Sequence, residues 1–175
     1  NTASNTITDN RIYGNARMGI QYEISSDALI ARNRVIGNGY HVYETIQNPS
    51  INVLVSSDVE VADNVVSGGS TGISVLAYDR EGFDSTVSGV HVHDNAIVRQ
   101  GGKALEWYDE NGSLAADPTN RGYSNDYWYP HGEDGSARFE WGGRQYSRLS
   151  EFNATPGEEA GRYMSVAEKD AVLAE

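Results

Sequence analysis

Hydrophobic and polar residues recur in a fixed order around four asparagines in the first hundred residues of the chain. An isoleucine or valine stands three residues before each asparagine, and another stands two residues after it. The position two before each asparagine never carries a large aliphatic residue. Such alternation is typical of short β-strands. The pattern therefore predicts one strand before and one strand after each of Asn10, Asn33, Asn64 and Asn95.

A third strand is predicted upstream of these pairs, because residues 19–24, 51–55, 72–77 and 104–108 alternate in the same way. A repeat with three short strands and no helix predicts one coil of a right-handed parallel β-helix, whose coils stack about 4.8 Å apart. We therefore expect an all-β fold of about four coils. A leucine-rich repeat is excluded because valine or isoleucine follows the asparagine, and a propeller blade needs about 40–45 residues and four strands.

The recurring asparagine is predicted to have a structural role. It lies at the bend between the second and third strands of each coil, where its side-chain amide can bond the asparagine of the next coil. Such ladders also form in stacked cross-β structures. We expect the four asparagines to turn the chain and to take no part in chemistry.

The repeat pattern divides the chain in two. Residues 1–109 are predicted to form the coils, and residues 110–175 an irregular, aromatic and acidic cap with short helices, because repeat stacks need a covered end. Within the cap we expect a strand at 137–141 and helices at 147–153 and 165–175, while Pro156 and the acids after it are typical of a helix start. Since the chain enters in the middle of a coil, the stack is expected to continue into upstream coils of the same or another chain.

The composition of the chain argues against several classes of binding partner and of site. The chain has 25 acidic and 13 basic residues, a formal charge of −12, which repels nucleic acid and anionic lipid. No apolar run approaches the roughly 18–20 residues that a membrane-spanning helix needs. The absence of cysteine excludes disulfides, thiolate metal sites and a cysteine nucleophile.

Three segments carry a resemblance to a known group. Residues 19–39 and 51–73 resemble the repeat of secreted right-handed parallel β-helix proteins of the pectate-lyase-like superfamily. Residues 139–159 are similar to the C-terminal region of bacterial members, where a Trp-Gly-Gly strand precedes a short Ser-Leu-x-x-Phe helix. The resemblance implies the C-terminal portion of an extracellular, bacterial-like protein that acts on polysaccharide. It leaves the activity open, because the group includes lyases, hydrolases and non-catalytic surface proteins, and the signature motifs of polygalacturonases and pectate lyases are missing.

In such helices the first strand and its turns form the substrate groove. Two enlarged loops, Gly39–Ser50 and Tyr78–Ser88, are predicted to flank that sheet. Function concentrates in loops on a rigid scaffold, although solenoid surfaces also tolerate insertions that do nothing. Alternation places one set of residues inward, namely Ile20, Ile24, Ile51, Val55, Ile73, Ala77 and Leu105. It places the other set outward, namely Gln21, Glu23, Asn52, Leu54, Ser74, Leu76, Glu106 and Tyr108.

The candidate site residues follow from this geometry. The catalytic candidates are Glu23, Asp79, Arg80 and Glu106. The substrate-binding candidates are Gln21, Glu44, Asn52 and Tyr108. Glycosidases hold two carboxylates about 5–9.5 Å apart, whereas Glu23 and Glu106 are expected three coils, or about 14 Å, apart. Each would need a nearer acid: Glu44 for Glu23, and Asp79 or Asp84 for Glu106.

A β-elimination would need a base such as Arg80 or Lys103, with acids holding Ca²⁺, which is therefore a possible cofactor. His91 and His93 are predicted to lie about 6.7 Å apart on one strand face. Because alternating polar residues are what an exposed strand needs anyway, no metal site is predicted there. The expected function is an extracellular polysaccharide lyase or glycoside hydrolase, and the alternative is a non-catalytic β-helix that binds glycan or builds a surface structure.

Overall fold

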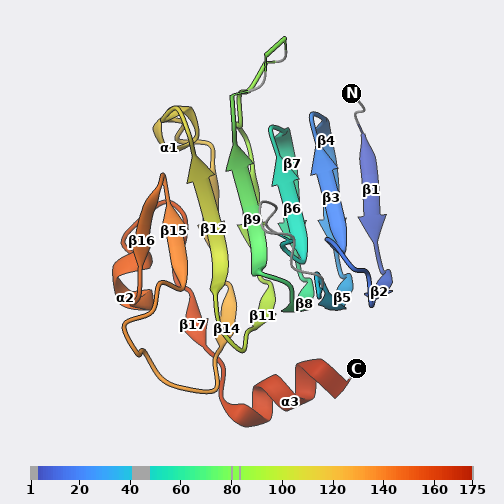
Figure 1. Ribbon diagram of the computed structural model, residues 1–175, viewed down its shortest axis with the longest axis vertical. Coiled ribbons are helices and arrows are strands. Elements are labelled where there is room, and N and C mark those ends of the chain that lie inside the picture. Colours follow the sequence, from blue (N-terminus) through green and yellow to red (C-terminus); the bar gives the residue numbers. More distant parts are fainter. Residues whose placement is uncertain (1–3, 41–47, 80, 83, 175) are drawn as a thin grey trace.

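Three parallel sheets wind around one core. The computed structural model describes residues 4–40, 48–79, 81–82 and 84–174. The chain passes through sheets A, B and C in turn and then begins the next coil, which gives the predicted parallel β-helix of about four turns (Figure 1). Sheet A contains β1 (Asn5–Thr8), β4 (Ser26–Ala31), β7 (Ser57–Ala62), β10 (His91–His93) and β13 (Arg121–Tyr123).

Sheet B contains β2 (Arg11–Tyr13), β5 (Arg34–Asn38), β8 (Val65–Gly68), β11 (Ala96–Val98), β14 (Asp126–Trp128) and β17 (Arg162–Tyr163). Sheet C contains β3 (Ile20–Glu23), β6 (Ile51–Leu54), β9 (Thr71–Ala77), β12 (Lys103–Asp109), β15 (Phe139–Trp141) and β16 (Arg144–Tyr146). Of the strand pairs in these sheets, only β15 with β16 is antiparallel. Three short helices complete the described chain: α1 (Ser113–Ala116), α2 (Leu149–Phe152) and α3 (Val166–Ala174).

The core consists of aliphatic side chains stacked in register from coil to coil. In sheet A, Ile30 lies between Ile7 and Val61 in one such column, and all but the outermost Ile7 are fully buried. In sheet C, Ile51 and Ile73 form an equivalent column. Each buried side chain of this size stabilises the fold by about 1.5–3 kcal/mol. The columns confirm that the aliphatic residues beside the recurring asparagine point inward.

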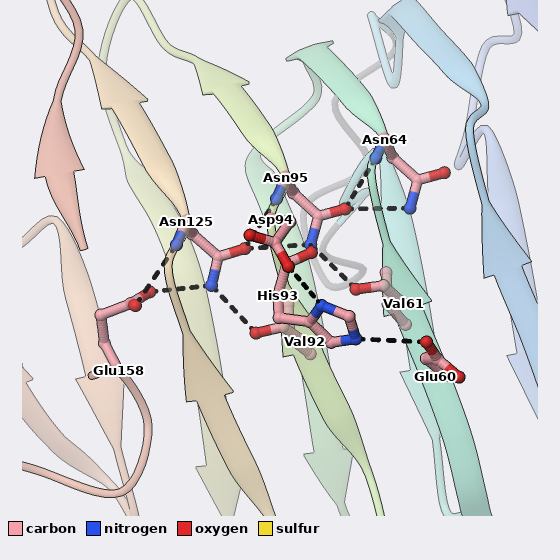
Figure 2. Close-up of polar contacts among 9 residues, drawn as sticks. All are labelled: Glu60, Val61, Asn64, Val92, His93, Asp94, Asn95, Asn125 and Glu158. Atoms are coloured by element: carbon pink, nitrogen blue, oxygen red, sulfur yellow. Dashed lines mark hydrogen bonds and ion pairs between the residues drawn. The ribbon is translucent and has the colours of Figure 1, made fainter. Parts of the chain in front are cut away.

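The recurring asparagines form the predicted ladder. In each rung the backbone N–H and the Nδ2 of one asparagine donate to Oδ1 of the asparagine in the next coil, at 2.9–3.1 Å. The residue before each asparagine has a left-handed backbone, with φ between 53° and 60°, which makes the sharp bend. The ladder runs from Asn10 through Asn33, Asn64 and Asn95 to a fifth member, Asn125, and its last part is drawn in Figure 2.

Two expected core residues lie elsewhere. Ile24 and Val55 were predicted to face inward, but both pack outside the main core against Leu54 and Leu76. Their backbones are left-handed, with φ of 48° and 47°, so the strand alternation ends one residue earlier than the sequence suggests. Left-handed φ is unusual for β-branched residues. Ala77, by contrast, does lie in the core as expected.

The coils continue past residue 109, so the predicted boundary between coils and cap is too early. β13 pairs with β10, and β14 pairs with β11, in parallel. Around Asn125, the two column positions hold Gly122 and Tyr127 instead of aliphatic residues. A side chain at Gly122 would meet the Gly157 carbonyl oxygen 2.0 Å away, which explains why glycine occupies that position.

The C-terminal segment covers the last coil and one side of the stack. Helices α2 and α3 confirm the helices expected near 147–153 and 165–175, but residues 155–158 form a bridged turn instead of a helix start. α3 lies across sheet B (Figure 1). Its Lys169 lies over the ring of Trp128, and Arg34 donates to the carbonyls of Val172 and Leu173. Cations are favoured at a helix C-terminus, so Arg34 helps to hold α3 across several coils.

Candidate functional site

The outward side chains of sheet C form two parallel rows that cross the strands. Strand register places Asn52 beside Ser74, and Glu106 beside Glu140. We call the first set the polar row, and it consists of Gln21, Asn52, Ser74, Glu106 and Glu140. We call the second set the apolar row, and it consists of Glu23, Leu54, Leu76 and Tyr108. Neighbouring members of a row lie one strand apart, about 4.8 Å.

Two carboxylates of the polar row share one lysine. Lys103 Nζ donates to Oε1 of Glu106 at 2.5 Å and to Oε2 of Glu140. Ser74 Oγ donates to the other oxygen of Glu106 at 2.9 Å. The Glu106 and Glu140 side chains are 1% and 3% exposed, whereas that of Lys103 is 19% exposed. The three groups form a compact cluster with one net negative charge, and its cation is the member nearest to solvent.

The cluster keeps Lys103 protonated. Burial lowers the pKa of Lys103, but the hydrogen bonds and negative charges of Glu106 and Glu140 outweigh burial, so the pKa is raised above its ordinary value of 10.5. An ammonium group cannot abstract a proton. The structure therefore argues against Lys103 as the base of a β-elimination.

Glu140 was not identified from the sequence, although a signal for it exists. The tripeptide Leu105-Glu106-Trp107 recurs in modified form as Phe139-Glu140-Trp141. The two tripeptides pair residue for residue in sheet C. Aligning them would have placed a second carboxylate beside Glu106.

The apolar row carries an aromatic pair. Leu54 and Leu76 are buried on this face, and Tyr78 and Tyr108 pack against them. The two tyrosine rings have centroids 4.9 Å apart and are tilted by 36°. Burial raises the pKa of Tyr78, and the nearby Tyr108 and Glu106 add to this effect. The partly exposed rings of Tyr78 and Tyr108 therefore offer aromatic surface on this face, above the buried leucines.

The side-chain oxygen of Asn52 is a hydrogen-bond acceptor that has no donor among the described residues. Its side chain is buried, with 2% of the residue exposed, and its Nδ2 makes a weak contact with the sulfur of Met18 at 3.9 Å. Its Oδ1 accepts no hydrogen bond from the residues that the structure describes. A buried acceptor left unsatisfied costs about 1–3 kcal/mol. Because this oxygen is buried, it is not open to a ligand on the outer face of sheet C.

The remaining candidates are placed less favourably. Gln21 is exposed and donates to Glu23 at the far end of the two rows. Asp79 is exposed, lies off both rows, and accepts from Asn111 Nδ2 at 2.6 Å. Glu44 and Arg80 lie outside the described residues. The structure therefore brings Asn52, Glu106 and Tyr108 onto one face but separates Asp79 from them.

The outer face of sheet A carries the two histidines. His93 stacks on Tyr123 with ring centroids 4.5 Å apart. Figure 2 shows the contacts of its two nitrogens, with Asp94 at 2.8 Å and Glu60 at 3.3 Å. Among the described residues, no three histidine, aspartate or glutamate side chains are arranged to hold a metal ion. His93 is thus held by ordinary polar and aromatic contacts.

The fold is that of a parallel β-helix protein, and the outer face of its sheet C carries the polar row and the apolar row. The chain belongs to the right-handed β-helix family, whose model, described as the right handed beta helix region, matches residues 1–117. This match confirms the predicted handedness. Comparison with curated proteins and with solved structures gives no match. In the part of the chain that the structure describes, no helix has the length and apolar character needed to cross a bilayer.

Proposed function

We propose that this protein is an extracellular, carbohydrate-active β-helix protein, and that the outer face of sheet C binds an oligosaccharide. The observation that carries the proposal is the position of the polar row directly beside the apolar row. Sugar rings have C–H faces that pack on aromatic and aliphatic side chains, and hydroxyl edges that need hydrogen-bonding partners. Tyr108, which is partly exposed, provides the first kind of surface, and the ammonium of Lys103, the most exposed member of the ion cluster, provides a donor for the second.

The charge of the face favours a neutral glycan. Lys103 balances only one of the two carboxylates, Glu106 and Glu140, and the whole chain has a charge of −12. A uronate polymer would be repelled unless Ca²⁺ bridged the like charges. We therefore expect neutral oligosaccharides to bind without metal, and acidic oligosaccharides to require Ca²⁺.

The cluster of Lys103, Glu106 and Glu140 supports oligosaccharide binding more strongly than catalytic turnover. Glycoside hydrolysis needs one carboxyl that holds a proton and one that is ionised. In this cluster both carboxylates are instead bound to one ammonium group, that of Lys103. Lys103, whose pKa is raised, stays protonated and does not serve as the base of a lyase. Of the activities expected from the sequence, non-catalytic glycan binding is the one that the site supports best.

Titration calorimetry with a panel of neutral and acidic oligosaccharides tests this function. We expect Tyr108→Ala, which leaves the ion cluster intact, to weaken the binding of a neutral oligosaccharide about tenfold or more, because an aromatic contact is worth about 1–3 kcal/mol in comparable stacking. Glu60→Gln on sheet A is the matched control and should bind like the wild type. Equal affinity of wild type and Tyr108→Ala, or cleavage of the oligosaccharide by the wild type, would contradict the proposal.

The edge formed by β1, β2 and β3 favours a second role, which is stacking with further β-helix coils of the same or another chain. These strands are the outermost described members of their sheets on one side. At this edge Ile7 and Ile12 are only partly buried, and Asn10 donates along the ladder while its side-chain Oδ1 accepts no hydrogen bond from the described residues. A coil with its own asparagine would fill that acceptor.

A chain lengthened by one coil tests this second role. We expect a copy of residues 28–58, placed directly before Asn5, to raise the denaturant concentration at the unfolding midpoint. The copy continues the register, since Asn5 pairs with Ala28 and Ala28 pairs with Val59. Replacing the copied asparagine by alanine should remove much of the gain. An unchanged midpoint for the lengthened chain would argue against stacking at this edge.

A further inference from the structure

The asparagine ladder ends on a glutamate. Asn125 donates from its backbone N–H to Oε1 of Glu158 at 3.4 Å, and from Nδ2 to Oε2 at 2.8 Å (Figure 2). The hydroxyl of Tyr127 also donates to Oε2 of Glu158. Glu158 is fully buried. It takes the place of a sixth ladder asparagine, and its two carboxyl oxygens accept the last donors of the ladder, which ends there.

Glu158 lies in the segment that covers the last coil. We call residues 155–164 the cap segment. Its carbonyls accept from the last strand of sheet A, with Gly122 N–H bonded to Pro156 at 2.9 Å and Ser124 N–H bonded to Glu159 at 2.7 Å. At its other end, Met164 N–H donates to the Tyr127 carbonyl at 2.7 Å. The cap segment therefore protects the edge of β13 and β14, which would otherwise be open for pairing.

No cation faces the Glu158 carboxyl among the residues described around it. The titratable group in contact with it is Tyr127, whose own pKa burial raises, and Glu159 contributes a backbone hydrogen bond. The nearest strand of the cap segment carries Arg162, but its guanidinium pairs with Asp126 and Glu168. Burial therefore raises the pKa of Glu158 to about 7, although the hydrogen bonds from Tyr127 and Asn125 act in the opposite direction.

We propose that Glu158 is a pH-sensitive latch, which holds the cap segment closed when protonated and weakens its hold when ionised. In the opened segment the carboxyl returns to its ordinary pKa of 4.5, whereas in the closed segment it keeps its proton up to about pH 7. Between these two values the closed state binds one proton more than the open state. Raising the pH through this window therefore favours opening by about tenfold per pH unit, and the effect levels off above pH 7.

Amide hydrogen exchange of the whole chain at pH 5 and pH 8 tests the latch. After correction for the intrinsic exchange rate, the protection of the Ser124, Arg162 and Met164 amides should fall on the order of fiftyfold in the wild type. In Glu158→Gln the same amides should show no such fall, because glutamine does not titrate. Glu159→Gln, which changes the exposed neighbour, should behave like the wild type. A fall in Glu158→Gln as large as in the wild type, or no fall in the wild type, would overturn the proposal.

Tyr127→Phe provides a second measurement should Glu158→Gln fold poorly. Removing the hydroxyl takes away a donor that stabilises the ionised carboxylate, so the closed-state pKa of Glu158 should rise. The loss of protection should then begin at higher pH than in the wild type. A transition at the same pH in both proteins would show that Glu158 is not the titrating group.

Discussion

Replacing Ile30 by aspartate should prevent the chain from folding. Ile30 is fully buried in the column that also holds Val61, on strand β4, which lies between β1 and β7 in sheet A. An unpaired charge at this position would cost several kcal/mol, which is most of the stability of a typical domain. Far-ultraviolet circular dichroism should show loss of the β-sheet signal and of any cooperative thermal transition.

Leu29→Asp is the matched control for this substitution. Leu29 is the neighbouring residue on the same strand, but its side chain lies on the outer face of sheet A and is only partly buried. Alternation therefore predicts a folded protein with a small loss of stability. A cooperatively melting Ile30→Asp variant, or equal loss of structure in both variants, would refute the assignment of Ile30 to the core column.

Replacing Asn64 by alanine should lower the free energy of unfolding by about 3 kcal/mol. The Asn64 side chain accepts two hydrogen bonds from Asn33 and donates to Asn95 Oδ1 and to the carbonyl of Ile30. All of these groups are buried, and each buried group left without a partner costs about 1–3 kcal/mol. Urea unfolding followed by fluorescence gives the difference directly.

The outermost rung supplies the comparison for Asn64→Ala. Asn10 is exposed, its side chain donates to Asn33, and its side-chain oxygen accepts nothing from the described residues, so Asn10→Ala should cost well below 1 kcal/mol. Oligosaccharide binding should be unchanged in both variants, because the ladder faces away from the outer surface of sheet C. Similar stability losses at the two positions would mean that the ladder does not stabilise the stack through its buried hydrogen bonds.

The fold could be predicted because its core repeats in one dimension. Stacked coils place equivalent residues on top of one another, so the isoleucines and valines around each asparagine appear in the sequence at regular spacing. The same reasoning failed for the coil around Asn125, where the contact with Gly157 requires glycine at position 122, and where Tyr127 reaches the carboxyl of Glu158. A close approach and a polar contact replaced the aliphatic pattern there, and the pattern alone could not detect the coil.

The candidate site could be predicted only in part, for a related reason. Strand alternation correctly placed Asn52, Glu106 and Tyr108 on the outer face of sheet C, because that face depends on local geometry alone. The pairing of Glu106 with Glu140 depends on which strands stack, across a connection of 29 residues (110–138) that itself contains α1, β13 and β14. The outward position of Val55 depends on a left-handed backbone that its side chain does not favour.

All hydrogen bonds of the asparagine ladder point in the same direction along the stack, which determines how coils can be added to the chain. Each internal rung donates toward one end and accepts from the other, with the same geometry at every step. Duplicating the 31 residues that separate Asn33 from Asn64 would therefore add a rung that fits between its neighbours without altering either end. Glu158 would still receive the final donors. The molecule can thus grow by whole coils through gene duplication, while an insertion of half a coil would interrupt the ladder and be confined to the loops.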